Sequence, residues 1–326
     1  MVKPTVISLF AGCGGSSLGY KYAGFKELLA IEWDDNAVKT FQLNFPNVPI
    51  WQKDIKEITG QEIMNSLGIN KGELDLLDGS PPCQGFSTAG KRVVSDGRND
   101  LVNENIRLIE ELEPKVFVIE NVSGMIKGKM KGLFIQYMKR MKSLNYQVKC
   151  KLMNAKYYNV PQSRQRVIFI GVRKDLGIEP NYPEGNKKLI TVQEAFKDIQ
   201  LIPKEINWAF KKMSAPKAKE MILKVKEGEN GSKYHPQGNW FSFLRISRNK
   251  PSPTIPKTIF GSGSGILHYK ENRALTMSEL KRLSSYPDDY KFIGKFEEQW
   301  ARIGNSAPPL FMKAIAEHIR INILEK

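Results

Sequence analysis

The sequence has few cysteines and few histidines, and both shortages exclude classes of protein. Only Cys13, Cys83 and Cys150 are present, and an odd number of cysteines cannot form a complete disulfide framework. A reducing compartment is therefore expected. The three histidines show no metal-ligand spacing with one another or with the cysteines, so we predict no metal site.

Long apolar runs are also missing. Runs such as Val116–Ile119 are far too short to cross a bilayer, so we expect no contact with a membrane. The first residues lead directly into an apolar strand without a small-residue cleavage site, so a signal peptide is not expected. With 326 residues, of which 41% are apolar and 26% charged, the chain can form one large or two modest globular domains.

Positive charge is what the chain has in excess. Fifty Lys and Arg against 34 Asp and Glu give a net charge of +16, which indicates a polyanionic partner such as nucleic acid. A soluble protein that is simply rich in lysine would fit the charge equally well. Because the excess is spread along the chain rather than gathered in a basic tail, binding would require a folded cleft.

The first half of the chain alternates strand and helix patterns. The expected strands are Thr5–Phe10, Glu27–Glu32, Val48–Gln52, Leu74–Asp78, Val116–Glu120 and Val167–Val172. Between them lie helical patterns at Ser16–Tyr22, Asp34–Asn44 and Leu101–Leu112. This alternation predicts an α/β fold with a parallel sheet covered by helices on both faces.

The pattern changes after Val172. Residues 173–243 are rich in Lys, Pro, Asn and Gly with scattered apolar positions, which predicts a smaller and irregular second domain beginning near Arg173. Helical periodicity returns over Asn272–Tyr286. A final helix is expected to begin after Pro308-Pro309 and to continue to about Ile323.

A glycine-rich turn, Phe10–Gly19 (FAGCGGSSLG), separates the first strand from the first helix. Glycines let a ligand approach the backbone, and the free N–H groups of a helix amino end attract polar atoms. Glu32, which ends the second strand, could take both hydroxyls of a ribose, and Trp33 could stack on an adenine. Asp54 could accept from the adenine amino group. Together they predict an adenosine-type cofactor, although Trp33 could instead be a half-buried packing residue and Asp54 a helix cap.

A second segment, Gly79–Ser87 (GSPPCQGFS), follows the strand that ends at Asp78. Its prolines stiffen the chain just before Cys83, whereas Gly85 and Gly90 leave the following loop free to move. A rigidly held thiol followed by a movable loop suits a covalent nucleophile. An isolated cysteine is more often a small core residue, but the Pro-Pro-Cys-Gln setting favours the nucleophile.

Over nearly its full length the chain resembles the DNA (cytosine-5)-methyltransferase family. The resemblance rests on five motifs in the family's order, namely FAGCGG, PPCQGFS, Glu120-Asn-Val122, Gln162-Ser-Arg-Gln-Arg166 and Gly304-Asn-Ser306. It implies a Rossmann-like, doubly wound, mostly parallel sheet of the S-adenosylmethionine-dependent methyltransferase type. It further implies a catalytic domain of residues 1–172 completed by 300–326, and a smaller domain of residues 173–299 with the target-recognition region at about 173–266.

The resemblance also implies the reaction. The methyl group of S-adenosylmethionine would pass to carbon 5 of a cytosine flipped out of duplex DNA, after the Cys83 thiolate adds to carbon 6. Glu120 would contact ring nitrogen 3 and the amino group and donate a proton. Arg166 would hold the base's carbonyl oxygen, and Arg164 a phosphate or a second polar group. Taken singly, Glu120 could instead cap a helix, and the two arginines could be surface ion-pair formers.

The binding residues that the resemblance implies fall into two sets. The cofactor set consists of Phe10, Ala11, Gly12, Gly14, Gly15, Glu32, Trp33, Asp54, Ile55, Asn305 and Ser306, of which Ser306 could equally be a helix N-cap. The stretch Gln237–Asn249 mixes aromatic, Arg and Asn side chains, which suits groove contacts, although solvated loop charges would look the same. The DNA set consists of Ser87, Lys91, Arg245, Arg248, Asn249 and Thr254.

Three other activities are compatible with parts of the sequence. A tRNA cytosine-5 methyltransferase shares the motifs, but the recognition domain favours DNA. A catalytically silent DNA-binding relative would usually lack Cys83, Glu120 or Arg166. A nicotinamide-dependent oxidoreductase would explain the turn and Glu32 but not PPCQ or QSRQR. The compact size suggests a monomeric modification enzyme in the cytoplasm of a prokaryotic or phage-infected cell, with a partner restriction endonuclease left open.

Overall fold

The computed structural model describes residues 2–82, 100–126, 131–213, 220, 222–234, 243–258 and 265–326. The chain divides into two compact units. Unit 1 consists of Met1–Asn154, Gln165–Glu184 and Phe311–Lys326, and unit 2 of Ala155–Arg164 and Gly185–Leu310.

The boundaries between the units differ from those expected at 172/173 and 299/300. Unit 1 extends to Glu184 because residues beyond Val172 remain attached to its sheet: the Tyr182 hydroxyl donates to the Ile168 carbonyl at 3.0 Å. Unit 2 keeps residues up to Leu310 because Trp300 and Ile303 are buried in its apolar core.

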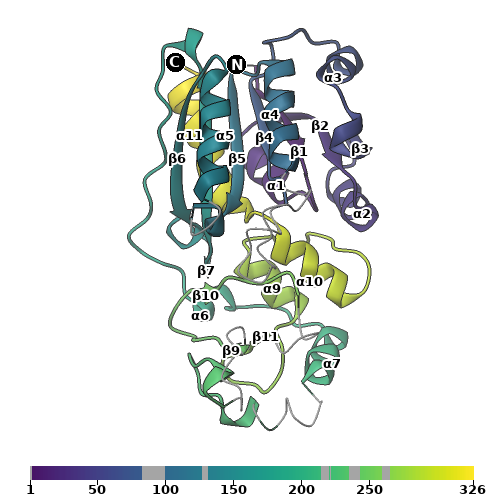
Figure 1. Ribbon diagram of the computed structural model, residues 1–326. Helices are drawn as coiled ribbons and strands as arrows, with labels where there is room; N and C mark the ends of the chain where they lie inside the picture. Colours follow the sequence, from purple (N-terminus) through teal and green to yellow (C-terminus); the bar gives the residue numbers. More distant parts are fainter. Residues whose placement is uncertain are drawn as a thin grey trace. The chain divides into compact units, whose positions relative to one another are not determined.

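Unit 1 is built on a seven-stranded sheet with the order β3-β2-β1-β4-β5-β8-β6 (Figure 1). The strands are β1 (Thr5–Leu9), β2 (Lys26–Glu32), β3 (Ile50–Gln52), β4 (Leu76–Gly79), β5 (Val116–Val122), β6 (Tyr146–Asn154) and β8 (Gln165–Arg173). The first five are parallel, whereas β8 runs antiparallel to both β5 and β6. The predicted mostly parallel α/β sheet is therefore confirmed, as are its six expected strands.

Helices cover both faces of this sheet. They are α1 (Gly15–Tyr22), α2 (Asp35–Asn44), α3 (Gly60–Leu67), α4 (Asp100–Leu112), α5 (Lys131–Ser143) and α11 (Pro309–Ile319), which continues as a π-helical turn over Arg320–Leu324. In Figure 1, α4 and α5 lie in front of the sheet and α11 lies behind it. Side chains that accept N–H groups fix two of the helix starts: Asp34 accepts from Ala37 N, and Thr59 from Glu62 N.

Unit 2 has short elements and a separate apolar core. Its helices are α6 (Val192–Ala195), α7 (Pro203–Lys212), α9 (Met277–Leu283) and α10 (Phe296–Asn305). Its strands form two parallel pairs, β7 (Gln162–Ser163) with β10 (Ser252–Pro253) and β9 (Phe243–Arg245) with β11 (Gly265–Leu267). These short elements agree with the irregular second domain predicted from the sequence. The helix expected over Asn272–Tyr286 is shorter, because Thr276 and Glu279 form a capping box that starts it at Met277.

Candidate active site

The glycine-rich turn follows the carboxyl end of β1, and every second residue from Phe10 to Gly14 has a left-handed backbone conformation. Phe10, Gly12 and Gly14 all adopt positive φ, at 55°, 56° and 87°, and Gly14 is the residue at which α1 is capped. A positive φ is uncommon for a residue with a Cβ, so Phe10 is held there by its surroundings. A Cβ on Gly12 would meet only the Phe10 carbonyl oxygen, at 4.0 Å, so a ligand can approach the backbone at this point.

Glu32 joins this turn to the end of β2. One carboxylate oxygen accepts from Gly12 N at 2.8 Å, and the other accepts from Trp33 N and Asp34 N at 2.9 Å. Burial raises the pKa of Glu32, while these backbone donors oppose the shift. The carboxylate is thus fixed at the carboxyl edge of the sheet, where parallel α/β folds bind ligands.

The other predicted adenosine contacts, Trp33, Asp54 and Ile55, differ in how far their side chains are exposed. Trp33 is 72% exposed, so it is not the half-buried packing residue that the sequence also allowed. Asp54 caps the single 3-10 turn Ile55–Glu57 by accepting from Lys56 N at 3.0 Å, which confirms the helix-cap interpretation without removing its exposed carboxylate from the surface. Ile55 is 4% exposed, so any contact with a cofactor would come from its main chain.

Glu120 and Arg166 meet on neighbouring antiparallel strands. Glu120 lies opposite Ile168 and Val122 opposite Arg166, so the two side chains are diagonal neighbours on one face of the sheet. Arg166 Nε lies 2.6 Å from Glu120 Oε1 in a largely buried ion pair. Glu120 therefore does not cap a helix, and Arg166 is not a surface ion-pair former. The structure brings these two predicted catalytic residues together.

Two asparagines lie against the segment before Cys83, and only Asn121 forms a hydrogen bond to it. The buried Asn121 donates from Nδ2 to the Pro81 carbonyl at 3.4 Å. A Cβ on Gly79 would lie 1.8 Å from Asn105 Nδ2, so this position has no room for a side chain. Asn121 could have been found from its place in the Glu-Asn-Val motif, whereas nothing in the sequence indicates Asn105. Cys83, Ser87 and Lys91 lie outside the described residues.

The QSRQR motif is divided between the units, which corrects the role expected for Arg164. Arg164 is 2% exposed in unit 2 and donates to the main-chain carbonyls of Ile255 at 3.4 Å and Gly304 at 3.0 Å. A guanidinium buried against main-chain carbonyls is not available to a phosphate, so Arg164 is neither a phosphate contact nor a surface ion-pair former.

Two of the five motifs and the segment that contains Thr254 converge around Arg164 in unit 2. Gln162 accepts from Ile255 N at 3.1 Å, and the exposed Thr254 donates to the Ser163 carbonyl at 2.9 Å. A Cβ on Gly304 would lie 2.3 Å from the Pro256 carbonyl oxygen, so only glycine fits there. The QSR, Thr254-Ile255 and Gly304-Asn-Ser segments thus form one interlocked structure.

Asn305 and Ser306, the predicted cofactor contacts of unit 2, come directly after Gly304 in the chain. Ser306 is the C-cap of α10, not a helix N-cap, and its hydroxyl accepts from the Tyr286 hydroxyl at 2.6 Å and donates to the Ala307 carbonyl. Asn305 is exposed.

Among the predicted DNA contacts, Arg245 requires correction. It is 5% exposed, and its guanidinium donates to the carbonyls of Val225, His268, Glu271 and Ile222 and to Asn272 Oδ1. A side chain with its donors engaged inside unit 2 cannot read a base.

The neighbours of Arg245 remain at the surface. Arg248 is half-exposed, forms a bidentate pair with Glu227 and lies over the Tyr269 ring at 5.1 Å. Asn249 is exposed.

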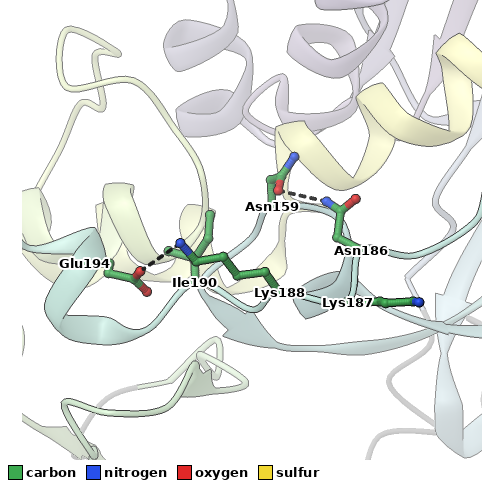
Figure 2. A pocket seen from close by; sticks show the side chains of 6 residues that line it. All are labelled: Asn159, Asn186, Lys187, Lys188, Ile190 and Glu194. Carbon is green, nitrogen blue, oxygen red and sulfur yellow. Dashed lines mark hydrogen bonds and ion pairs between the residues drawn. The ribbon is translucent and has the colours of Figure 1, made fainter.

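Unit 2 also contains a polar hollow of about 680 Å³ lined by Asn159, Asn186, Lys187, Lys188, Ile190 and Glu194. Figure 2 shows Asn186 donating to Asn159 Oδ1, at 2.8 Å, and Lys188 paired with Glu194 at 3.8 Å. None of the predicted site residues lines it. In the part of the chain that the structure describes, three or more His, Cys, Asp or Glu side chains do not gather as metal ligands, and no helix is long and apolar enough to span a membrane.

Comparison with known proteins agrees with this geometry. The model of the family described as C-5 cytosine-specific DNA methylase matches residues 4–320. The type II methyltransferase M1.HphI of Haemophilus parahaemolyticus is 35% identical over 97% of this chain and 86% of its own length. The type II methyltransferase M.XorII of Xanthomonas oryzae is 32% identical over 98% of this chain and 85% of its own length.

Solved structures give the same result for the fold. The crystal structure of a DNA modification methyltransferase encoded by an E. coli prophage superposes with a TM-score of 0.80 at 25% identity, covering 99% of this chain and all of that one. The DNMT2 structure of Spodoptera frugiperda has a TM-score of 0.69 over 99% of this chain and all of its own, at 18% identity, and supports the fold alone.

Proposed function

Because the chain belongs to the C-5 cytosine-specific DNA methylase family, it is a DNA cytosine-5 methyltransferase that uses S-adenosylmethionine, and we propose that Cys83 is its covalent nucleophile. The observation that carries the proposal is the Glu120–Arg166 ion pair at 2.6 Å, together with the anchoring of Pro81 by Asn121 on the same strand as Glu120. Chemistry on a cytosine needs a polar, positively charged group for the base and a nucleophile beside it.

The proposed step accounts for every electron pair. The Cys83 thiolate forms a bond to carbon 6 of a flipped-out cytosine, and the ring's electron pair moves to carbon 5. S-adenosylmethionine would supply the methyl group to carbon 5; the electron pair of the broken sulfur–methyl bond would stay on sulfur, and S-adenosylhomocysteine would leave. Loss of the proton from carbon 5 to water then restores the double bond and expels the thiolate.

Glu120 and Arg166 act on the ring during this step. Negative charge builds on the base when the thiolate adds, and a guanidinium fixed in place stabilises such charge without having to reorient. Arg166 holds the carbonyl oxygen, while Glu120 contacts ring nitrogen 3 and the amino group. Their mutual contact keeps both side chains oriented before the base arrives.

The cofactor contacts of unit 1 fit an adenosine. The turn from Phe10 through Gly15 is open at Gly12, Glu32 is anchored for the ribose hydroxyls, and the exposed indole of Trp33 is free to stack. Asp54 and the main chain of Ile55 receive the adenine edge. Asn305 and Ser306 are the cofactor contacts proposed for unit 2.

The setting proposed is that of a monomeric, cytoplasmic modification enzyme acting on duplex DNA in a restriction–modification system with a cognate endonuclease. The support is that the relatives M1.HphI and M.XorII are type II methyltransferases. Arg248, Asn249 and Thr254 remain the proposed DNA contacts of the described part of unit 2, with Ser87 and Lys91 added from the sequence.

The test is the trapping of the covalent intermediate. Duplex DNA with 5-fluorocytosine at the target cannot lose a proton from carbon 5, so wild-type enzyme with S-adenosylmethionine should form an adduct that survives denaturation. Mass spectrometry should place the adduct on Cys83, and Cys83→Ser should form none while still binding DNA and cofactor. An adduct on Cys13 or Cys150 would overturn the assignment.

A further inference from the structure

Arg107 joins helix α4 to the loop that follows β3. Its Nη2 donates to two main-chain carbonyls of that loop, Ile55 at 3.1 Å and Ile58 at 2.9 Å. Its Nε and Nη1 pair with Glu104 and Glu111 of the same helix, both at 2.8 Å. One guanidinium, mostly buried, therefore sets the distance between two points of the loop and between the loop and α4.

A second contact, at Gly60, holds the end of this loop against α4. Gly60 N donates to Glu111 Oε2 at 2.5 Å, and a Cβ on Gly60 would lie 2.6 Å from Glu111 Cβ. Between these contacts the side chains of Ile55 and Ile58 are buried, while Asp54 is exposed at the carboxyl edge of the sheet. The exposed part of the loop is thus held from behind by α4.

We propose that Arg107 is a positioning residue for cofactor binding, which holds residues 54–58 in the conformation that receives the adenine. The inference rests on the proposed function, because it assumes that Asp54 and Ile55 contact the adenine. Arg suits this task because its planar fork can satisfy two carbonyls and two carboxylates at once, whereas the lysine ammonium is a single point charge.

The competing interpretation is that Arg107 only stabilises the fold, and the chain offers a matched control. Arg173 also clamps main-chain carbonyls, donating from Nη1 to Gly72 at 2.9 Å and to Glu113 at 2.6 Å, and it pairs with Asp175. These contacts precede β4 and β5, at the edge of the sheet opposite the candidate site. Arg173→Ala therefore removes a similar clamp without touching the adenine loop.

The experiment measures S-adenosylmethionine affinity by calorimetry for the full chain and its variants. If losing the clamp reduces the competent fraction of the loop to about one tenth, the apparent Kd for Arg107→Ala rises about tenfold, because the affinity is reduced by that fraction. The KM for S-adenosylmethionine should rise in parallel, with kcat at saturating cofactor within about twofold of wild type. Arg107→Lys, which keeps the charge and tests the same point if the alanine variant fails to fold, should weaken binding about threefold.

The outcomes separate the two hypotheses. Equal affinities for wild type, Arg107→Lys and Arg173→Ala would overturn the positioning role. Asp54→Ala should weaken binding as well. If it does but the Arg107 variants do not, only the clamp is wrong, whereas unchanged affinity in Asp54→Ala would remove the adenine site on which the proposal rests.

Discussion

The two units bury charged side chains in different ways. In unit 2, the fully buried Arg273 makes two hydrogen bonds of 2.8 Å to the buried carboxylate of Glu279 and a further contact to Glu271 at 3.1 Å. In unit 1, Asp78 is 1% exposed and accepts from the Tyr20 hydroxyl at 3.0 Å, and Glu27 accepts from Ser17 at 2.8 Å. Neither of these two carboxyls has an ion pair within the described part of the chain.

The difference appears in the pKa values of these buried groups. Burial, aided by the negative charges of Glu27 and Glu120, raises the pKa of Asp78 to about 8, and burial raises the pKa of Glu27 to about 7. In unit 2 the two glutamates beside Arg273 outweigh burial and raise the pKa of its guanidinium, so the guanidinium stays charged. A buried ion needs a partner, and a buried acid without one keeps its proton.

The largest effect is expected from breaking the pair in unit 2. Arg273→Leu should lower the free energy of unfolding by about 3–5 kcal/mol, because it leaves the carboxylate of Glu279 buried without its cation. Chemical denaturation measures the loss. The control is Lys39→Ala, which breaks the exposed Lys39–Asp35 pair and should cost less than about 0.5 kcal/mol. Similar small losses in both variants would mean that unit 2 does not depend on its buried pair.

Replacing the buried acid Asp78 of unit 1 should raise the free energy of unfolding at neutral pH, whereas Arg273→Leu lowers it. The folded pKa of Asp78 lies above its unfolded value, so its stability contribution is complete below about pH 4 and is lost as pH rises towards 8. Asp78→Asn removes this titration and still accepts from Tyr20. Relative to wild type it should gain at least about 2 kcal/mol between pH 5 and pH 8, since each pH unit is worth up to about 1.4 kcal/mol. Parallel stability curves would show that Asp78 is ionised in the folded protein.

Much of unit 1 could be predicted from the sequence because its strands are buried on both faces. Runs such as Val116–Glu120 are apolar and β-branched, and only a parallel sheet explains so many of them between helices. The strand β6 was missed because Lys149 and Lys151 interrupt its apolar pattern at the sheet edge. The helix α3 was missed because only the Thr59 cap and a few apolar residues mark it.

Candidate site residues could be found from the sequence where they belong to a recognisable motif. Whether an arginine contacts a ligand or is buried in the fold could not be decided from the sequence. Gly12 of the turn donates to Glu32, and Glu120 pairs with Arg166, while their contacts with cofactor and base stay predictions. Sequence alone could not show that Arg164 and Arg245 are buried, because the acceptors that satisfy them are main-chain carbonyls supplied by segments far away in the chain. Every residue has a main-chain carbonyl, so the residue types do not reveal which carbonyls accept these hydrogen bonds.

The smallest effect on stability, and the sharpest on function, concerns Arg248. Unlike Arg245, it lies at the surface, and its pair with Glu227 is half-exposed, so Arg248→Ala should cost less than about 1 kcal/mol of stability. If Arg248 contacts a phosphate, the variant should bind every duplex more weakly, and the salt dependence of its affinity should fall by about one unit of slope.

Glu227→Gln provides the opposing variant, because it frees the guanidinium from its carboxylate and should strengthen binding. Affinities for target and non-target duplexes at several salt concentrations measure both effects. A loss of about 1–3 kcal/mol confined to one position of the target would instead make Arg248 a base reader. No change in affinity or slope in either variant would place Arg248 with Arg245, as a residue that serves the fold of unit 2 and not its contact with DNA.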